Sequence, residues 1–423
     1  MSSIPMSSPV PIIRPVPDDT LEPQTEPPGG FVQALRADPQ ALVYMLLNVG
    51  DGDTQLILLP ADEAGHRQLV IVDVATRGKL PPLLDSLHDA GFIARPGTPG
   101  QVRLLVASHP HHDHIGGMTE LLKRYTEAGS IDQLWEPGYF YPSPSFHNLM
   151  KQLEGRSDIR WVQPTSGTSL FLGPVRFTVV GPGVGLKNRF DTYGVNVNDA
   201  SITLMVEYPA TKIQAERDPD NHGRVNRRLV RRKTRRLLLG ADAQFTSWAQ
   251  ATVDFPNLEQ EYNPVLAREL RSATGGDYLK ADLMKVSHHG SKHGVNIELL
   301  ERVAAPTVLV SSLSGGGKYN FPHLLAMEAV REARQPSTTS AADREPDYAL
   351  GVHITGGKLE SGEEMGSIAA VIGSSGTAPI RLFRFFDARD ADIELHKARE
   401  ARKVPRPRRR GAAKASEASA DGA

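Results

Sequence analysis

The most informative segment of this 423-residue chain is Ser108-His109-Pro110-His111-His112-Asp113-His114-Ile115-Gly116-Gly117. It follows an apolar run at 102–107, which has the composition of a buried strand, and it precedes a helix-like segment from Met118. The histidines are therefore expected on a loop at the carboxyl end of a strand. Imidazole and carboxylate groups are ligands of zinc, manganese and iron, so this density of both indicates a metal site rather than isolated surface histidines.

A second histidine window, Ser287-His288-His289-Gly290-Ser291-Lys292-His293, follows another strand-like run. Short runs rich in Val, Ile and Leu alternate with segments that have apolar residues at three- and four-residue spacing, which predicts a layered α/β body. The predicted strands are 42–47, 55–59, 68–74, 102–107, 175–180, 202–207, 235–239, 282–286 and 307–311. The predicted helices are 80–90, 118–128, 245–253, 296–303 and 324–333.

The four residues His109, His111, Asp113 and His114 match the HxHxDH signature of the metallo-β-lactamase fold superfamily. Between about 43 and 335, further segments in the same order resemble the soluble domain of ComEC-type DNA-uptake proteins and their stand-alone relatives. These segments are 48–53 (NVGDGD), 70–73 (VIVD), 198–201 (NDAS), 238–242 (LLGAD), 283–291 (LMKVSHHGS) and 320–323 (NFPH). The resemblance implies an αββα sandwich with the site at one edge of its two sheets.

The resemblance also implies two metal ions, with Zn²⁺ expected and Mn²⁺ as the alternative. His109 and His111 would bind the first ion, and Asp113 and His114 the second. Asp242 would bridge both, since a carboxylate has two oxygens.

Four further residues are candidates for the same site. One of His288 and His289 would complete the second metal site, and the other would act as a hydrogen-bond or proton donor; the sequence does not decide which. Asp73, at a strand end, is expected to orient a histidine ring. Many superfamily members supply a third histidine to the first metal, but none lies between His147 and His222 here, so Asn198 is the nearest candidate.

A site of this kind predicts hydrolysis by a metal-activated water. Phosphodiester bonds, including those of nucleic acids, are the expected substrate, with Asp113, His288 and His289 as catalytic candidates. Two alternatives remain open: hydrolysis of a small ester, lactone or thioester, and a metal-containing nucleic-acid-binding protein without catalysis. A GxSxG nucleophile elbow and a Walker phosphate loop are both absent from the sequence.

The charges nearly cancel overall, 48 basic against 49 acidic, but they are segregated. Eight basic residues and no acid occupy 224–236, within an insertion predicted at 209–234. Such a run is either a solvated loop or helix face, or a surface for phosphates of a nucleic acid. The second interpretation assigns nucleic-acid contacts to Arg227, Arg228, Arg231 and Arg232.

The ends of the chain differ from its body. Residues 1–35 are rich in proline and are predicted to be a disordered lead-in, and 391–423 a basic, largely disordered tail, which leaves 36–390 as one hydrolase domain. Cysteine is absent, which excludes disulfides and thiolate metal ligands. Neither a membrane-spanning apolar run nor a secretory signal is visible, so a cytoplasmic protein is expected.

Overall fold

The computed structural model describes residues 30–187, 196–217, 225–230, 233–251, 278–313, 319–334, 350–356 and 366–384. Residues 1–29 of the predicted lead-in and the whole predicted tail, 391–423, lie outside these residues, as do Arg231 and Arg232. Within the described residues, no helix is long and apolar enough to cross a membrane.

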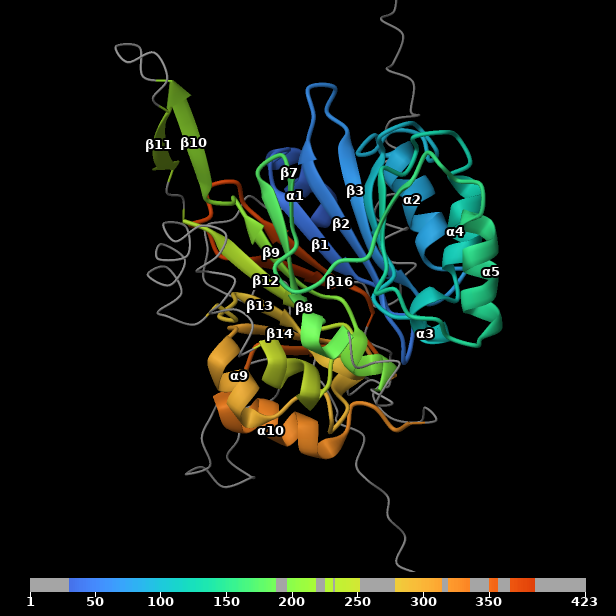
Figure 1. The fold of residues 1–423 in the computed structure, drawn as a ribbon. Coiled ribbons are helices and arrows are strands. Elements are labelled where there is room, and N and C mark those ends of the chain that lie inside the picture. The colour runs from blue at the N-terminus through green and yellow to red at the C-terminus, as the bar shows by residue number, and fades with distance from the viewer. Residues whose placement is uncertain are drawn as a thin grey trace, which may run out of the picture.

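Two mixed β-sheets face each other and carry helices on their outer faces, as predicted for an αββα sandwich (Figure 1). The first sheet has the order β17-β16-β1-β2-β3-β4-β5-β6 and the second β15-β14-β13-β12-β9-β8-β7. The strands of the first sheet are β1 (Leu42–Leu46), β2 (Thr54–Ala61), β3 (Arg67–Val74), β4 (Val102–Val106), β5 (Gln133–Trp135), β6 (Arg160–Val162), β16 (Ile368–Ile372) and β17 (Arg381–Arg384). Those of the second are β7 (Ser169–Leu172), β8 (Val175–Gly181), β9 (Thr203–Tyr208), β12 (Arg235–Leu239), β13 (Leu283–Lys285), β14 (Thr307–Val310) and β15 (Val352–Ile354).

The helices are α1 (Phe31–Ala37), α2 (Leu80–Asp89), α3 (His112–Ile115), α4 (Met118–Arg124), α5 (Pro144–Leu153), α9 (Ile297–Val303) and α10 (Leu324–Arg334), with short 3-10 turns η1 (Val197–Ala200) and η2 (Ser287–Gly290). Residues 245–251 are also helical, at the predicted position. In Figure 1, α2, α4 and α5 cover the first sheet, and α9 and α10 the second.

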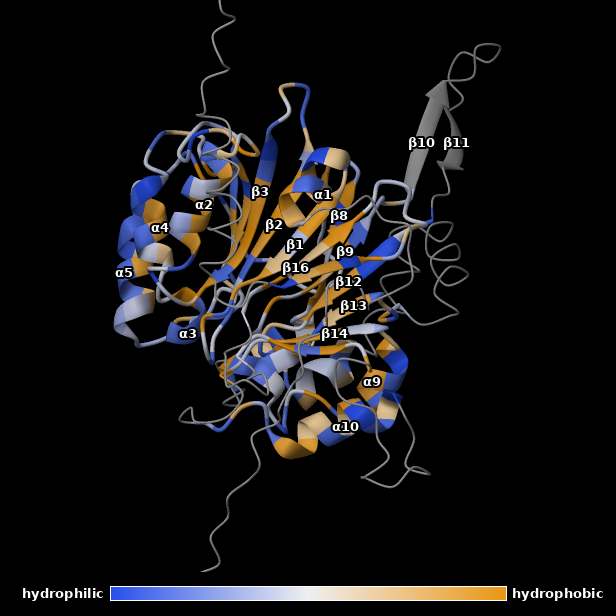
Figure 2. Cartoon of the chain, turned by 180° about the vertical axis from the view of Figure 1, so that it is seen from behind, coloured by the Kyte–Doolittle hydropathy of each residue, from blue (hydrophilic) through white to orange (hydrophobic). Residues whose placement is uncertain are grey.

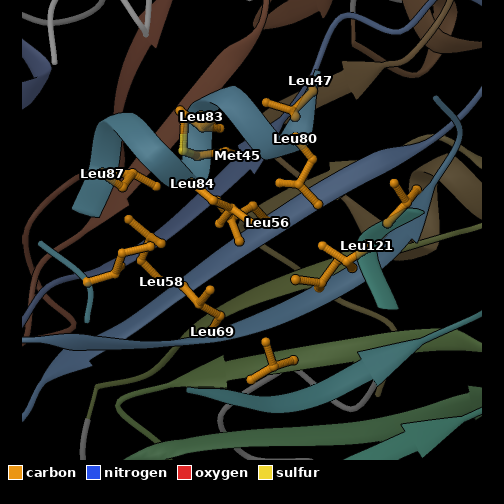
Figure 3. Close-up of a cluster of buried hydrophobic side chains, with 14 of the residues drawn as sticks. Met45, Leu47, Leu56, Leu58, Leu69, Leu80, Leu83, Leu84, Leu87 and Leu121 are labelled. Atoms are coloured by element: carbon orange, nitrogen blue, oxygen red, sulfur yellow. The ribbon is translucent and has the colours of Figure 1, made fainter. Parts of the chain in front are cut away.

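Both faces of the central strands are buried, which explains why these strands are almost continuously apolar. In β1, Val43 and Met45 pack towards the helices, whereas Leu42, Tyr44 and Leu46 pack between the two sheets. The helix-side core of the first sheet is shown in Figure 3, where leucines of α2 lie on the strands: Met45, Leu56, Leu58 and Leu69 against Leu80, Leu83, Leu84 and Leu87. Figure 2 shows the apolar strands lying inside and the polar faces of the helices outside.

The topology places the functional loops at one end of the sandwich and the basic insertion at the other. Strands β3, β4, β12 and β13 all end near the histidine windows, because β12 is parallel to β13 and β3 is parallel to β4. The insertion joins the far end of β9 to the start of β12, where Tyr208 pairs with Arg235. It forms an antiparallel hairpin of β10 (Lys212–Arg217) and β11 (Val225–Val230), rather than the loop or helix considered from its charge alone. The hairpin projects from the sandwich (Figure 1).

Two sequence predictions need correction, and six strands were missed. The predicted lead-in extends too far, because helix α1 starts at Phe31 and buries four apolar side chains, with Phe31 against Phe383 at 5.8 Å between ring centroids. The helix predicted at 118–128 ends at Arg124. Strands β5, β6, β7, β15, β16 and β17 were not predicted; most have only three or four residues, too few to show a period.

Candidate metal centre

The HxHxDH segment turns sharply between the end of β4 and α4. His111 immediately precedes the short helix α3, which contains Asp113 and His114. Gly116 and Gly117 follow with ordinary negative φ values, −58° and −94°, so backbone freedom does not explain them. The close packing at Gly117 requires a glycine, because a Cβ there would lie 2.3 Å from the carbonyl oxygen of Thr76, in the loop after β3.

Three fully buried histidines are fixed through Nδ1. Each Nδ1 has an oxygen partner, so the Nε2 of each ring is turned towards the centre of the site. The partners are Ser108 Oγ for His109 (3.1 Å), Asp73 Oδ2 for His114 (2.7 Å) and the main-chain oxygen of Ser311 for His289 (3.1 Å). Ser108 Oγ itself donates to Asp73 Oδ2 at 2.6 Å, so one carboxylate positions two of the rings, which is the orienting role predicted for Asp73.

The three Nε2 atoms converge on the buried carboxylate of Asp242. Their distances to its nearest oxygen are 3.7 Å for His109, 3.2 Å for His114 and 3.5 Å for His289. Two ligands that each lie 2.0–2.2 Å from a tetrahedral zinc ion are separated by about 3.4 Å. The spacing therefore matches atoms that share an ion.

Four buried polar atoms at this point have no hydrogen-bond partner in the described structure: His114 Nε2, His289 Nε2, Asp242 Oδ1 and Asn198 Oδ1. Buried polar atoms without partners are rare because they lose their hydration without compensation. Asp242 Oδ1 and Asn198 Oδ1 offer lone pairs to a cation, and the two Nε2 atoms do so when their rings are neutral. The donor set, imidazole nitrogen with carboxylate and amide oxygen, suits Zn²⁺ or Mn²⁺.

His111 and Asp113 complete the cluster on the solvent side. His111 Nδ1 lies 3.1 Å from His109 Nε2. Asp113 Oδ2 lies 3.8 Å from His289 Nε2, and its side chain is 39% exposed. Every ligand predicted from the sequence is therefore brought to one place.

The geometry distinguishes the two neighbouring histidines that the sequence left open. His289 is fully buried and faces both Asp113 and Asp242, so it has the place of a ligand. His288 is 17% exposed, and Gln244 Nε2 donates to its Nδ1 at 3.0 Å. His288 Nε2 lies 3.7 Å from Asp242 Oδ2 and 3.4 Å from the amide nitrogen of Asn198, so this ring stands at the mouth of the site beside both residues.

Backbone strain accompanies these positions. Asp73, Ala241, His288 and His289 all have left-handed φ values, from 43° to 58°. Non-glycine residues rarely adopt this conformation, and it is found preferentially at functional sites. It brings the side chains at the ends of β3, β12 and β13 inwards.

Two residues of the site were quoted from the sequence only as parts of motifs. The Asp53 carboxylate lies behind His289, with Oδ1 at 3.6 Å from its Nδ1, and it accepts a hydrogen bond from the buried ammonium of Lys285. Gln55 Nε2 is 3.5 Å from the same carboxylate. Sequence spacing could not show that residues 232 positions apart form a buried ion pair.

The charges of the cluster are coupled. Burial raises the pKa of Asp242, but the neighbouring His114, His289 and His109 outweigh it and hold that pKa well below its usual range. Burial lowers the pKa of His114, yet Asp242 and Asp73 raise it well above normal. Burial, followed by the charge of His114, lowers the pKa of His109. Asp242 is thus a carboxylate that needs a cation, and a metal ion must displace the proton of His114.

Aromatic side chains flank the cluster on two sides. Tyr141 lies edge-on to His111 at 5.0 Å between ring centroids. Phe321 lies 5.5 Å from His288, and Tyr319, which is 57% exposed, stacks on Phe321 at 5.7 Å. A small, mainly apolar pocket beside His109 is lined by Pro110, Ile115, Pro137, Phe146, Leu149 and Met150, with Glu136.

Part of the chain matches a known protein family. Residues 64–193 match the family model of the metallo-beta-lactamase superfamily. Similar solved structures include the metallo-beta-lactamase fold protein YhfI from Bacillus subtilis (10% identity, 74% of this chain and 95% of that chain, TM-score 0.35). Others are CmlA, a diiron beta-hydroxylase from Streptomyces venezuelae (12%, 73% and 51%, TM-score 0.34), and a long form RNase Z from yeast (10%, 65% and 38%, TM-score 0.32). No curated protein sequence matches the chain.

Proposed function

Because the chain has the metallo-β-lactamase fold, we propose that it is a metal-dependent hydrolase that uses a metal-activated water. The observation that carries the proposal is the convergence of three Nε2 atoms on Asp242 at 3.2–3.7 Å, two of which, in His114 and His289, have no hydrogen-bond partner in the described structure. Bound metal ions supply hydroxide near neutral pH and polarise the oxygen of the bond under attack.

The residues divide into those that would hold metal and those that position them. His109, His111 and the amide oxygen of Asn198 would hold one ion, and Asp113, His114 and His289 the other, with Asp242 facing both; two Zn²⁺ ions suit this set. Asp73 and Ser311 keep the Nε2 atoms of His114 and His289 directed inwards. His288, whose Nε2 lies 3.7 Å from Asp242 at the mouth of the site, would be the proton donor to the leaving group.

Phosphodiesters are the first substrate class in this proposal. The support is the order of motifs that resembles the ComEC-type soluble domain, including the segment that contains Asp53 and the segment 283–291. A phosphodiester needs charge stabilisation at two oxygens, which a pair of ions supplies.

The position of the basic hairpin limits the kind of phosphodiester that could contact both the hairpin and the metal centre. Arg227 and Arg228 lie on β11, beyond the end of β12 that is remote from Asp242. The five residues of β12 alone span roughly 15 Å, so a substrate that touches both hairpin and metal must be a polymer. Changing Arg227, Arg228, Arg231 and Arg232 to Gln should then weaken cleavage of a polynucleotide and flatten its salt dependence, while a small phosphodiester is cleaved normally.

Small esters are the second candidate, because a specific observation favours them. The mouth of the site presents Tyr141, Tyr319 and Phe321 around the histidines. An aryl or acyl group of a carboxylic ester, lactone or thioester would bury apolar surface there.

A substrate panel separates the two. If phosphodiesters are the substrate, zinc loading should increase the rate of hydrolysis of bis(p-nitrophenyl) phosphate by a larger factor than that of p-nitrophenyl butyrate. D242N should lose both activities, whereas D132N, which changes a surface carboxylate paired with Arg103, should lose neither. Activity only on the carboxylic ester would favour the second candidate, and equal activity of D242N and wild type would reject both.

A further inference from the structure

A second cluster of unpaired polar groups lies at the open edge of the sandwich, where β15 of one sheet approaches β17 of the other. His353 on β15 is 1% exposed and pairs with Leu309, a residue of the core between the sheets. Arg384 on β17 pairs with Ile368, which belongs to the same core. Both side chains therefore point into the space between the two sheets.

The two side chains meet there. The Arg384 guanidinium donates a hydrogen bond to Nδ1 of His353, so the proton of that ring is on Nε2. His353 Nε2 and Arg384 Nη1 are both buried without a hydrogen-bond partner in the described structure. Each is an N–H donor, unlike the lone-pair atoms that converge at the metal centre.

Arg334, the last residue of α10, reaches the same edge. Its Nη2 would lie 3.8 Å from a Cβ on Gly351, two residues before His353, and it too is buried without a partner. Burial lowers the pKa of Arg334, and it lowers the pKa of Arg384 to about 10. Burial, then the charges of Arg384 and Arg334, lower the pKa of His353 well below its usual value.

Arg334 and Arg384 have no acidic partner among the described residues. Elsewhere in the second sheet, the buried arginines Arg176 and Arg236 share the carboxylate of Glu207, with Arg236 Nε at 3.3 Å from its Oε1. No described carboxylate forms an ion pair with Arg334 or Arg384. A buried guanidinium without a counter-charge is unfavourable, and guanidinium groups bind phosphate and carboxylate oxygens with directed pairs of hydrogen bonds.

We propose that Arg384, Arg334 and Nε2–H of His353 form a binding site for a small oxyanion, phosphate or sulfate, between the edges of the two sheets. The anion would accept hydrogen bonds from both arginines and the histidine and so join β15 to β17. The site is separate from the metal centre, and it would bind its ligand whether or not the protein is a hydrolase.

Calorimetric titration of the zinc-loaded full chain with inorganic phosphate, and then with sulfate, tests the site, with chloride at matched ionic strength as the reference. R384Q and R334Q should each weaken binding at least about 10-fold, because each removes a charged hydrogen-bond donor. R381Q is the matched control: it removes a positive charge from the same strand, where Arg381 contacts the ring of Phe383 on the helix side, and it should bind like wild type.

Two results would overturn the assignment. One is phosphate and sulfate binding that is equally tight in wild type, R384Q and R334Q; if that binding also disappears in D242N, the anion lies at the metal centre. The other is no binding in the millimolar range by the wild type. R334Q changes the end of a surface helix, so it keeps the test decisive if R384Q does not fold.

Discussion

Replacing Lys285 with Met should destabilise this protein far more than replacing Lys285 and Asp53 together. Both side chains are fully buried, and the Lys285 ammonium donates to the Asp53 carboxylate. K285M leaves that carboxylate buried with only Gln55 at 3.5 Å and the ring of His289 at 3.6 Å. Loss of one member of a buried ion pair costs about 3–5 kcal/mol, whereas removal of both charges is close to neutral.

Urea unfolding of the metal-free proteins measures this difference without a contribution from metal binding. We expect K285M to lose about 3–5 kcal/mol and D53N/K285M to recover most of it. K123M, which breaks the exposed pair with Glu120 at 3.2 Å, should change the free energy of unfolding by less than about 1 kcal/mol. A K285M protein as stable as K123M, or a double variant no more stable than K285M, would refute the buried-pair argument.

Three further outcomes are expected. D73N removes the negative charge and one of the two oxygens that accept from His114 Nδ1 and Ser108, so metal affinity, measured by competition with a chelator, should fall about 10- to 100-fold; unchanged affinity would contradict its orienting role. H288Q should keep the wild-type metal content, measured by elemental analysis, and lose turnover; loss of metal would make His288 a ligand. His353 stays neutral in the folded state, because burial and two arginines lower its pKa. On unfolding below about pH 6.5 it takes up a proton, so the free energy of unfolding decreases as the pH is lowered. In phosphate-free buffer, urea unfolding between pH 7.5 and 5.5 should show a weaker pH dependence for H353Q than for wild type, by up to about 1.4 kcal/mol per pH unit; equal slopes would contradict this.

The sequence predicted the metal centre better than the edges of the fold. Local motifs contain most of the ligand candidates, and His109, His111, Asp113 and His114 lie within six residues. The short apolar runs also predicted most of the central strands of both sheets. By contrast, strand β16 pairs with β1 across more than 300 positions, and its five residues show no two-residue alternation because both faces are buried.

The roles of His288 and His289 could not be separated from sequence for a related reason. Adjacent residues on a left-handed turn point in different directions, and only the tertiary partners Ser311 and Gln244 show which ring faces inwards. The Arg384–His353 contact, likewise, depends on the approach of two strands from different sheets.

Metal dependence tests the central claim most directly. The protein should be stripped with chelator and titrated with Zn²⁺, and bound metal and hydrolysis of bis(p-nitrophenyl) phosphate or p-nitrophenyl butyrate measured on the same samples. The account predicts that activity is absent without metal, rises with bound zinc to a plateau at one to two equivalents, and stays absent in D242N, which should bind less metal. Full hydrolytic activity in the metal-free protein, or zinc binding by D242N equal to that of wild type, would contradict it.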